Sequence, residues 1–260
     1  MQFGQQTELS KQKSLSERPK RIPCIGHFVP VFTALLILLS GCASKPELPP
    51  AREPQPDTSA AKKLFTEPDF PRLIRSVENE HGPIAGNRIR HWATLVERGK
   101  SLKTYEQLVE TNRFFNGAQF LTDQEVWQTD DYWATPIEFL IKDAGDCEEF
   151  AIAKYITLRY MGLEDEKMRI TYVKALTLNQ AHMVLGYYTE PSQIPLVLDN
   201  LNPRILPANE RDDLVPVYSF NSADLWLAKS DKDQKTRTEL QAVENLRPWQ
   251  SLLQKLRGDR

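Results

Sequence analysis

The chain has 260 residues, of which 40% are hydrophobic, and its formal net charge is −2. These values suit one globular domain of ordinary size with extensions. They give no reason to expect a nucleic-acid partner, because no basic stripe with interleaved aromatic residues is present. The three cysteines, Cys24, Cys42 and Cys147, lie in different sequence contexts, which argues against a disulfide framework.

The N-terminus has the pattern of a secretory signal. A basic segment at residues 18–21 precedes an apolar run over 28–39, and small residues follow it. The run is shorter than the roughly 20 residues of a membrane span, so residues 1–42 are predicted to be a signal peptide. Residues 39–42 also resemble a bacterial lipobox, in which Cys42 would carry a lipid. The alternatives are an ordinary signal peptide cut nearby and an uncleaved anchor.

A proline-rich segment follows the predicted signal. Residues 43–65 contain five prolines, a composition typical of a stiff, disordered tether. We therefore expect one folded domain over 66–260, located in the periplasm and anchored to a membrane if Cys42 is lipidated. Apart from Cys42, Cys147 would be the only thiol there, and an unpaired cysteine in an oxidising compartment is a candidate reactive group.

The folded part is predicted to begin with helices. Apolar residues recur at helical spacing over 83–99 and again over 102–115. A third helix is expected to start at Cys147, with Asp146 as its N-cap and Gly162 as its stop.

The period of the sequence then changes from helical to alternating, which is typical of strands. Segments rich in β-branched and aromatic residues predict strands at 169–175, 182–188, 195–199, 214–220 and 225–227. A last amphipathic helix is expected over 235–256, interrupted near Pro248. Helices first and an antiparallel sheet second predict an α+β fold.

Cys147 is the candidate nucleophile. In the first turn of a helix the backbone N–H groups are unpaired and the dipole is positive, which stabilises a thiolate and can bind an oxyanion during acyl transfer. His182 is the candidate base, because it is the only histidine in the predicted sheet. Asp199, at the end of an apolar strand, is the candidate for orienting the imidazole, with Asn200 as the runner-up.

Each of these residues also has an ordinary structural explanation. A cysteine can be a small buried apolar residue, a histidine in a strand often has only a structural partner, and Asp199-Asn200 is typical of a turn. Three ordinary residues would rarely align as a cysteine at a helix start, a histidine in a strand and an aspartate ending the next strand. The combination therefore favours a catalytic triad of Cys147, His182 and Asp199.

The residues beside Cys147 are acidic, which opposes a reactive thiol. Asp146, Glu148 and Glu149 carry negative charge that raises the pKa of a neighbouring thiol. A structural interpretation is a capping box, with Asp146 at the N-cap, Glu149 at N3 and Glu148 solvated. The functional interpretation is a Ca²⁺ site, since this ion takes roughly 6–8 oxygen ligands and would cancel the local negative field.

Four motifs together resemble one protein family. They are Trp-Ala-Thr-Pro at 133–136, Gly-Asp-Cys-Glu-Glu-Phe-Ala at 145–151, Ala-His-Met-Val-Leu at 181–185 and Leu-Val-Leu-Asp-Asn-Leu at 196–201. In this order they are similar to the bacterial transglutaminase-like cysteine proteinases. The resemblance implies a papain-like, transglutaminase-like fold with a Cys-His-Asp triad, which falls on Cys147, His182 and Asp199.

The resemblance also implies a cofactor, a substrate and a regulator. Similar proteases need calcium around the catalytic loop, where the matching positions are Asp146 and Glu148, together with Glu149, although the family often has Asp at that last position. The implied substrate is a large surface adhesin, cut near its N-terminus at a paired-alanine site so that the cell leaves its surface. The implied inhibitor is a membrane-spanning cyclic-di-GMP receptor. A lipid on Cys42 departs from the soluble periplasmic members of the family.

The sequence is also compatible with two other functions. A transglutaminase or an amidase acting on side-chain or cell-wall amides would use the same triad and the same acyl-enzyme. A non-catalytic binding module with a relic triad is less favoured, because no triad member is missing. Trp133 is expected either to pack in the core or to line the groove and help polarise the scissile carbonyl.

Overall fold

The computed structural model describes residues 65–228 and 246–258. The predicted signal peptide, Cys42 and residues 43–64 of the predicted linker lie outside this part of the chain. Phe65, which the prediction assigns to the linker, is instead buried, and its ring packs edge-on against Tyr155 with the centroids 5.6 Å apart. Within the described ranges, no helix is both long enough and apolar enough to cross a membrane.

The described chain begins with two long helices. Helix α2 (Phe70–Gly99) bends at Gly82, whose φ of 85° and ψ of 170° break the helical backbone just before Pro83. The predicted helix at 83–99 is therefore confirmed as its second half. The first half was missed because only Phe70 and Val77 are fully buried there, which leaves a weak apolar stripe. Helix α3 (Thr104–Phe115) confirms the second predicted helix.

Four short elements, none of them predicted, connect α3 to the helix that carries Cys147. They are β1 (Gln119–Phe120), α4 (Asp123–Val126), α5 (Pro136–Lys142) and β2 (Ala144–Gly145). Strands β1 and β2 pair in parallel. In α5, Thr135 accepts the N–H of Glu138 and the proline of the first turn lacks only an N–H that would be unpaired there. These elements lead the chain to the start of the next helix.

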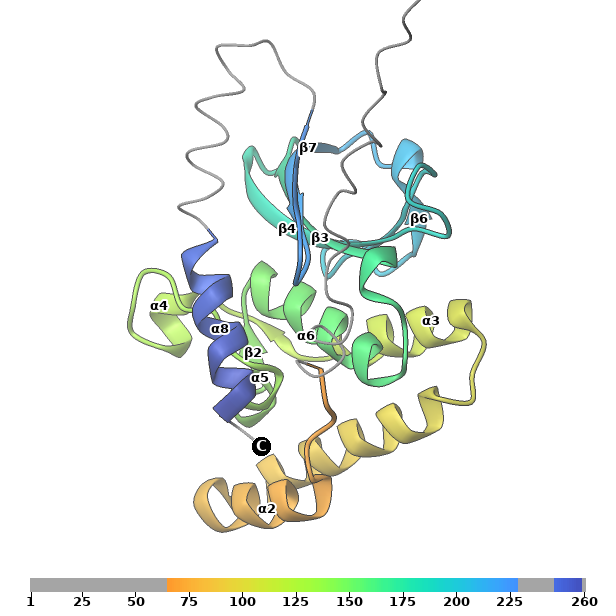
Figure 1. Ribbon diagram of the computed structural model, residues 1–260. Coiled ribbons are helices and arrows are strands. Elements are labelled where there is room, and N and C mark those ends of the chain that lie inside the picture. The colour runs from red at the N-terminus through yellow and green to blue at the C-terminus, as the bar shows by residue number, and fades with distance from the viewer. Residues whose placement is uncertain (1–64, 229–245, 259–260) are drawn as a thin grey trace, which may run out of the picture. The chain divides into compact units, whose positions relative to one another are not determined.

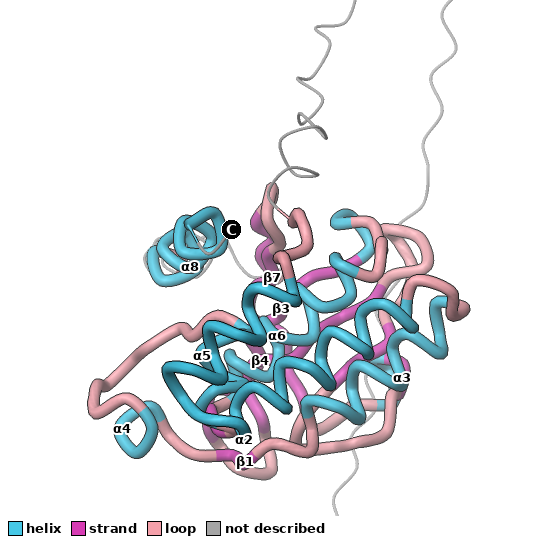
Figure 2. Tube along the Cα trace, turned by 90° about the horizontal axis from the view of Figure 1, so that it is seen from below, coloured by secondary structure: helices cyan, strands magenta, loops and turns pink. Residues whose placement is uncertain are grey.

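Helix α6 (Cys147–Tyr160) lies at the centre of the described structure, between the sheet and the helices α2 and α3 (Figures 1 and 2). Every residue from Glu149 to Leu158 is buried, so the helix is enclosed on all sides and not on one stripe alone. Trp92 of α2 donates its indole N–H to Thr157 Oγ1 over 2.8 Å, which fixes the two helices to each other.

The sheet has six antiparallel strands in the order β6-β5-β4-β3-β7-β8. They are β3 (Met168–Ala175), β4 (Gln180–Tyr187), β5 (Leu196–Leu198), β6 (Leu206–Pro207), β7 (Leu214–Phe220) and β8 (Leu225–Leu227). All five predicted strands are present with small shifts at their ends, and β6 is additional. Figure 2 shows the long helices gathered on one side of the strands. A helical layer against an antiparallel sheet confirms the predicted α+β class.

Helix α8 (Arg247–Gly258) packs on this core through Trp249. Its indole N–H donates to the carbonyl of Asn221 over 3.0 Å, and its ring meets Tyr155 and Phe220 edge-on. Pro248 lies in the first turn, where proline is tolerated, and does not interrupt this part of the helix. Residues 235–245 of the predicted last helix lie outside the described ranges.

Candidate functional site

The pairing of β4 with β5 brings His182 and Asp199 together. Leu185 pairs with Leu198, so Asp199, the residue after β5, lies beside the half of β4 that carries His182. Nε2 of His182 is 2.7 Å from Oδ1 of Asp199, and both side chains are buried. Within the described residues, His182 makes this hydrogen bond with Asp199 and none with the runner-up, Asn200.

Cys147 lies at the first position of α6 and shares a pocket with His182. The pocket has a volume of about 230 Å³. Its walls combine three aromatic residues, two acidic residues and part of β4: Trp133, Tyr172, Tyr218, Asp131, Glu148, Ala181 and Met183. The structure thus places the candidate nucleophile and the candidate base at one accessible cavity, with Asp199 behind the imidazole.

Both oxygens of the Asp199 carboxylate are occupied. Oδ1 accepts from His182 and from the Leu201 N–H, and Oδ2 accepts from Arg211 Nη2 over 2.7 Å. Burial alone would raise the pKa of Asp199, but the His182 hydrogen bond and charge, the Leu201 N–H and Arg211 together lower that pKa to about 2. Asp199 is therefore a carboxylate at neutral pH. Arg211 was not predicted, because no motif marks it.

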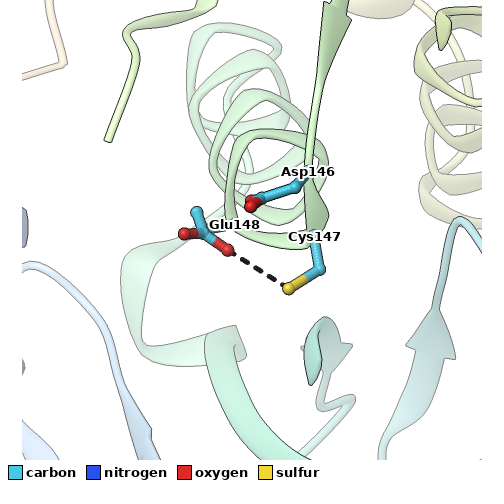
Figure 3. A group of neighbouring side chains, drawn as sticks. All are labelled: Asp146, Cys147 and Glu148. Atoms are coloured by element: carbon cyan, nitrogen blue, oxygen red, sulfur yellow. Dashed lines mark hydrogen bonds between the residues drawn. The ribbon is translucent and has the colours of Figure 1, made fainter. Parts of the chain in front are cut away.

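The thiol of Cys147 meets negative charge in this arrangement. Figure 3 shows the carboxylates of Asp146 and Glu148 beside it, and Sγ is 3.1 Å from Glu148 Oε2. Burial, the charges of Glu148 and Asp146 and the hydrogen bond to Glu148 raise the pKa of Cys147 well above its usual value. The backbone of Met183 acts in the opposite direction. With the carboxylates ionised and uncompensated, the thiol keeps its proton.

The acidic cluster is larger than the sequence indicated. Asp123 and Asp131 join the predicted Asp146, Glu148 and Glu149 in overlapping groups of three, and within each group the ligand atoms lie within 4.8 Å of one another. Glu149 also has the capping role expected of it, because its Oε2 accepts the Asp146 N–H over 3.0 Å. Glu148, however, is only partly exposed, and burial raises its pKa well above the usual range.

The cluster has the chemistry of a site for a hard cation. Oδ1 of Asp146 and Oδ1 of Asp123 are buried without a hydrogen-bond partner, which is costly for a carboxylate oxygen. Burial raises the pKa of Asp123 to about 6, and the charges of Asp146 and Asp131 add to that effect. Several carboxylate oxygens lie close together, and two of them lack a hydrogen-bond partner. This arrangement fits an ion such as Ca²⁺, which prefers oxygen ligands.

The same cluster supports the loop that carries Trp133. Asp123 Oδ2 accepts the Tyr132 N–H over 2.5 Å, and Glu149 Oε1 accepts the Ala134 N–H over 3.0 Å. The backbone on both sides of Trp133 is therefore held by acidic residues. Trp133 itself stacks on Phe220 and lines the pocket, so it both packs and forms part of the cavity wall.

Lys154 is a buried charge on α6 that the sequence did not reveal. It is only 1% exposed, and burial lowers the pKa of its ammonium group to about 7, although the charge of Asp199 acts to raise it. The unfolded chain, with an ordinary lysine pKa, binds a proton between pH 7 and 10 that the folded chain releases. The free energy of unfolding therefore increases as the pH rises through that window, because the penalty for burying a charged Lys154 disappears.

Replacing Lys154 with methionine is expected to stabilise the protein, most strongly at and below pH 7. The cost of the buried ammonium is on the order of 4 kcal/mol there, and it fades as the pH approaches 10. Urea unfolding at pH 7 and pH 9.5 measures the difference between variant and wild type. A difference that does not shrink with rising pH would contradict the assignment of a buried, titrating Lys154.

Comparisons with known proteins point to one family. The family model described as bacterial transglutaminase-like cysteine proteinase matches residues 93–234, which include Cys147, His182 and Asp199. LapG of Legionella pneumophila is 38% identical with a TM-score of 0.62, covering 73% of this chain and 99% of that one. Its EGTA-treated form gives the same identity and TM-score, over 73% and 100% of the two chains. Its calcium-bound form is 44% identical with a TM-score of 0.56, over 61% and 88%. No match was found among the curated proteins.

Proposed function

We propose that this chain, which belongs to the bacterial transglutaminase-like cysteine proteinases, is a calcium-dependent endopeptidase that works through Cys147, His182 and Asp199. The observation that carries the proposal is the shared pocket of Cys147 and His182, with His182 hydrogen-bonded to the buried Asp199. This is the arrangement that acyl transfer to a thiol requires: a nucleophile, a base and a group that orients the base.

The chemistry follows from the positions of these groups. Because Nε2 of His182 is bound to Asp199, Nδ1 is the ring nitrogen left to take the proton of the Cys147 thiol. The thiolate attacks the carbonyl carbon, and the oxygen that becomes negative is stabilised by N–H groups at the start of α6. His182 then gives its proton to the leaving amine, which breaks the peptide bond and leaves a thioester on Cys147. Water hydrolyses this thioester with His182 again acting as base.

Asp199 serves the histidine throughout this cycle. As a carboxylate at neutral pH it accepts a hydrogen bond from the Nε2–H group of His182, which fixes the ring orientation and the tautomer and stabilises the imidazolium that forms when the thiol ionises.

Asp146, Glu148 and Glu149, together with Asp123, would hold the calcium ion. A bound Ca²⁺ would supply positive charge that offsets the carboxylates beside the thiol. The unpaired oxygens of Asp146 and Asp123 support this assignment, as does the calcium-bound form of Legionella LapG. Asp123 and Glu149 would also keep the backbone around Trp133 in place at the pocket.

We further propose that the enzyme is periplasmic, with its predicted signal at 1–42 and a lipid on Cys42, and that it cuts a large surface adhesin near its N-terminus. Cutting would release the adhesin and end attachment in a biofilm. A membrane-spanning cyclic-di-GMP receptor is the proposed inhibitor, which would sequester the protease when the messenger is abundant. The likeness to LapG over nearly its whole length supports the proposed location, substrate and inhibitor, whereas the lipid on Cys42 is proposed from the lipobox-like residues 39–42 alone.

An N-terminal adhesin fragment with a paired-alanine site is the substrate for the test. Incubated with the purified protein and Ca²⁺, this fragment is expected to give two products whose new ends, mapped by mass spectrometry, lie at the paired alanines. Replacing both alanines with bulky residues is the matched control, and it should block the cut. An intact fragment under these conditions, or cleavage that ignores the alanine pair, would contradict the proposed substrate.

A further inference from the structure

We propose that Arg211 is a positioning residue for the reaction, acting through Asp199. This inference rests on the proposed function, because it assigns a fourth member to the group of Cys147, His182 and Asp199. Arg211 lies directly after a short 3-10 turn (Ala208–Glu210) that leads from β6 towards β7, far from α6 in the sequence. Its side chain is only 3% exposed, although arginine is seldom buried without a specific partner.

The contact of Arg211 complements that of His182. Nη2 of Arg211 binds Oδ2 of Asp199 over 2.7 Å, while His182 Nε2 binds Oδ1, also over 2.7 Å. A carboxylate held at one oxygen only can rotate about its last bond. Held at both oxygens, and by the Leu201 N–H at Oδ1, it is fixed in the plane that keeps Oδ1 in line with the imidazole.

Asp213 fixes the arginine in turn. Arg211 Nε binds Asp213 Oδ1 and Nη2 binds Asp213 Oδ2, each over 2.8 Å, which is the two-point contact typical of an arginine–carboxylate pair. Asp213 is about half exposed, at 43% of its side-chain area. The support for Asp199 therefore runs from a surface residue, through the buried guanidinium, to the carboxylate behind the imidazole.

Other charged groups face Asp199 and must be considered in any test. Lys154 of α6 acts on Asp199 by charge alone, since its ammonium makes no hydrogen bond or ion pair within the described residues. Burial lowers the pKa of this ammonium to about 7, so it is only partly charged at neutral pH, and it does not hold either carboxylate oxygen. Arg211→Met therefore removes a positive charge together with the contact to Oδ2, and Arg211→Lys, which keeps the charge, separates the two effects.

The first arm of the test measures kcat and KM for cleavage of the adhesin fragment in the presence of Ca²⁺. Arg211→Met is expected to lower kcat by about 10–100-fold, by analogy with the loss of hydrogen-bond partners behind metal ligands, with little change in KM. Arg211→Lys keeps the charge but loses the two-point contact, and a partial loss of kcat is expected. Arg159→Met is the matched control, because Arg159 is a largely buried arginine paired with Asp165 away from the pocket, and its kcat should stay at the wild-type value.

The second arm observes the hydrogen bond itself by proton NMR in a Cys147→Ala background. The His182 Nε2 proton, shared with Asp199, is expected to give a far-downfield resonance that Arg211→Met broadens or removes and Arg159→Met leaves in place. Because this arm needs no substrate, it separates the two claims. If the protein cuts no adhesin fragment but shows the resonance change, the proposed substrate is refuted and the positioning role of Arg211 is still supported.

If Arg211→Met does not fold, Asp213→Ala is the variant that tests the inference. Asp213 is half exposed, so its replacement should be tolerated, and its loss only loosens the guanidinium. A fall in kcat smaller than that of Arg211→Met, with a broadened resonance, is then expected. Wild-type kcat with an unchanged resonance in Arg211→Met or Asp213→Ala would overturn the inference. An equal loss of kcat in Arg159→Met would overturn it too, because the effect would then reflect general stability.

Discussion

Replacing Cys147 with alanine is expected to abolish cleavage of the adhesin fragment, with a loss of about 10⁴-fold or more. Without the sulfur there is no nucleophile, and the acyl-enzyme cannot form. The folded state should be little affected, since Cys147 is a single half-buried residue at the edge of the pocket and alanine suits a helix. Cleavage is followed by gel electrophoresis over time, and stability by thermal unfolding.

Two comparisons sharpen this result. Ser76→Ala is the matched control, because it makes a similarly small change at an exposed position of α2 and leaves the pocket intact. Cys147→Ser retains a hydroxyl of similar size, and it should remain severely impaired, because a serine hydroxyl ionises far less readily than a thiol. Cleavage by Cys147→Ala at a rate near that of the wild type would refute the assignment of the nucleophile.

Removal of calcium is expected to have the second-largest effect. With EGTA in excess, cleavage should stop, because burial and the charges of Glu148 and Asp146 then raise the pKa of the thiol without compensation by the cation. Added Ca²⁺ should restore the rate, whereas Mg²⁺ should do so poorly, since Mg²⁺ demands stricter geometry and sheds water reluctantly. The measurement is the cleavage rate against free Ca²⁺ concentration.

Asp123→Asn tests the cation site apart from the thiol. Asp123 belongs to the cluster, with a buried unpaired oxygen, but it forms no hydrogen bond with Cys147 within the described residues. The variant should need about 10–100-fold more Ca²⁺ for half-maximal rate and reach a near-normal rate at saturation. Glu164→Gln, an exposed change at a site away from the cluster, is the control. A wild-type enzyme that ignores EGTA would leave Glu149 with its capping role alone.

Much of the fold could be predicted from local patterns. The start of α6 was visible from Asp146 and the apolar stripe behind it, and the strands from alternating β-branched residues. Short helices such as α5 were missed because seven residues cannot show a periodic stripe. Their only local mark is a cap, and Thr135 followed by Pro136 and Glu138 is a mark that could have been used.

The candidate site was predictable only where a residue carries its own chemical signal. Cys147, His182 and Asp199 were chosen for their types and places in the chain, and the structure places them together; their roles stay predictions. Asp123, Asp131 and Arg211 were not foreseen, because acidic and basic residues in loops are common and only the tertiary fold selects these. Lys154 was hidden for a related reason: periodicity predicts one buried face, whereas α6 is enclosed on every side.

The central claim is that Cys147 is a nucleophile whose reactivity depends on calcium and on His182. The most direct measurement is mass mapping of the protein after reaction with a peptide chloromethyl ketone that carries the sequence of the paired-alanine site. The predicted result is one adduct, on the peptide that contains Cys147, formed with Ca²⁺ and strongly reduced by EGTA or by His182→Ala. An adduct that forms equally with and without Ca²⁺, or one that forms on another residue while Cys147 stays free, would contradict the claim.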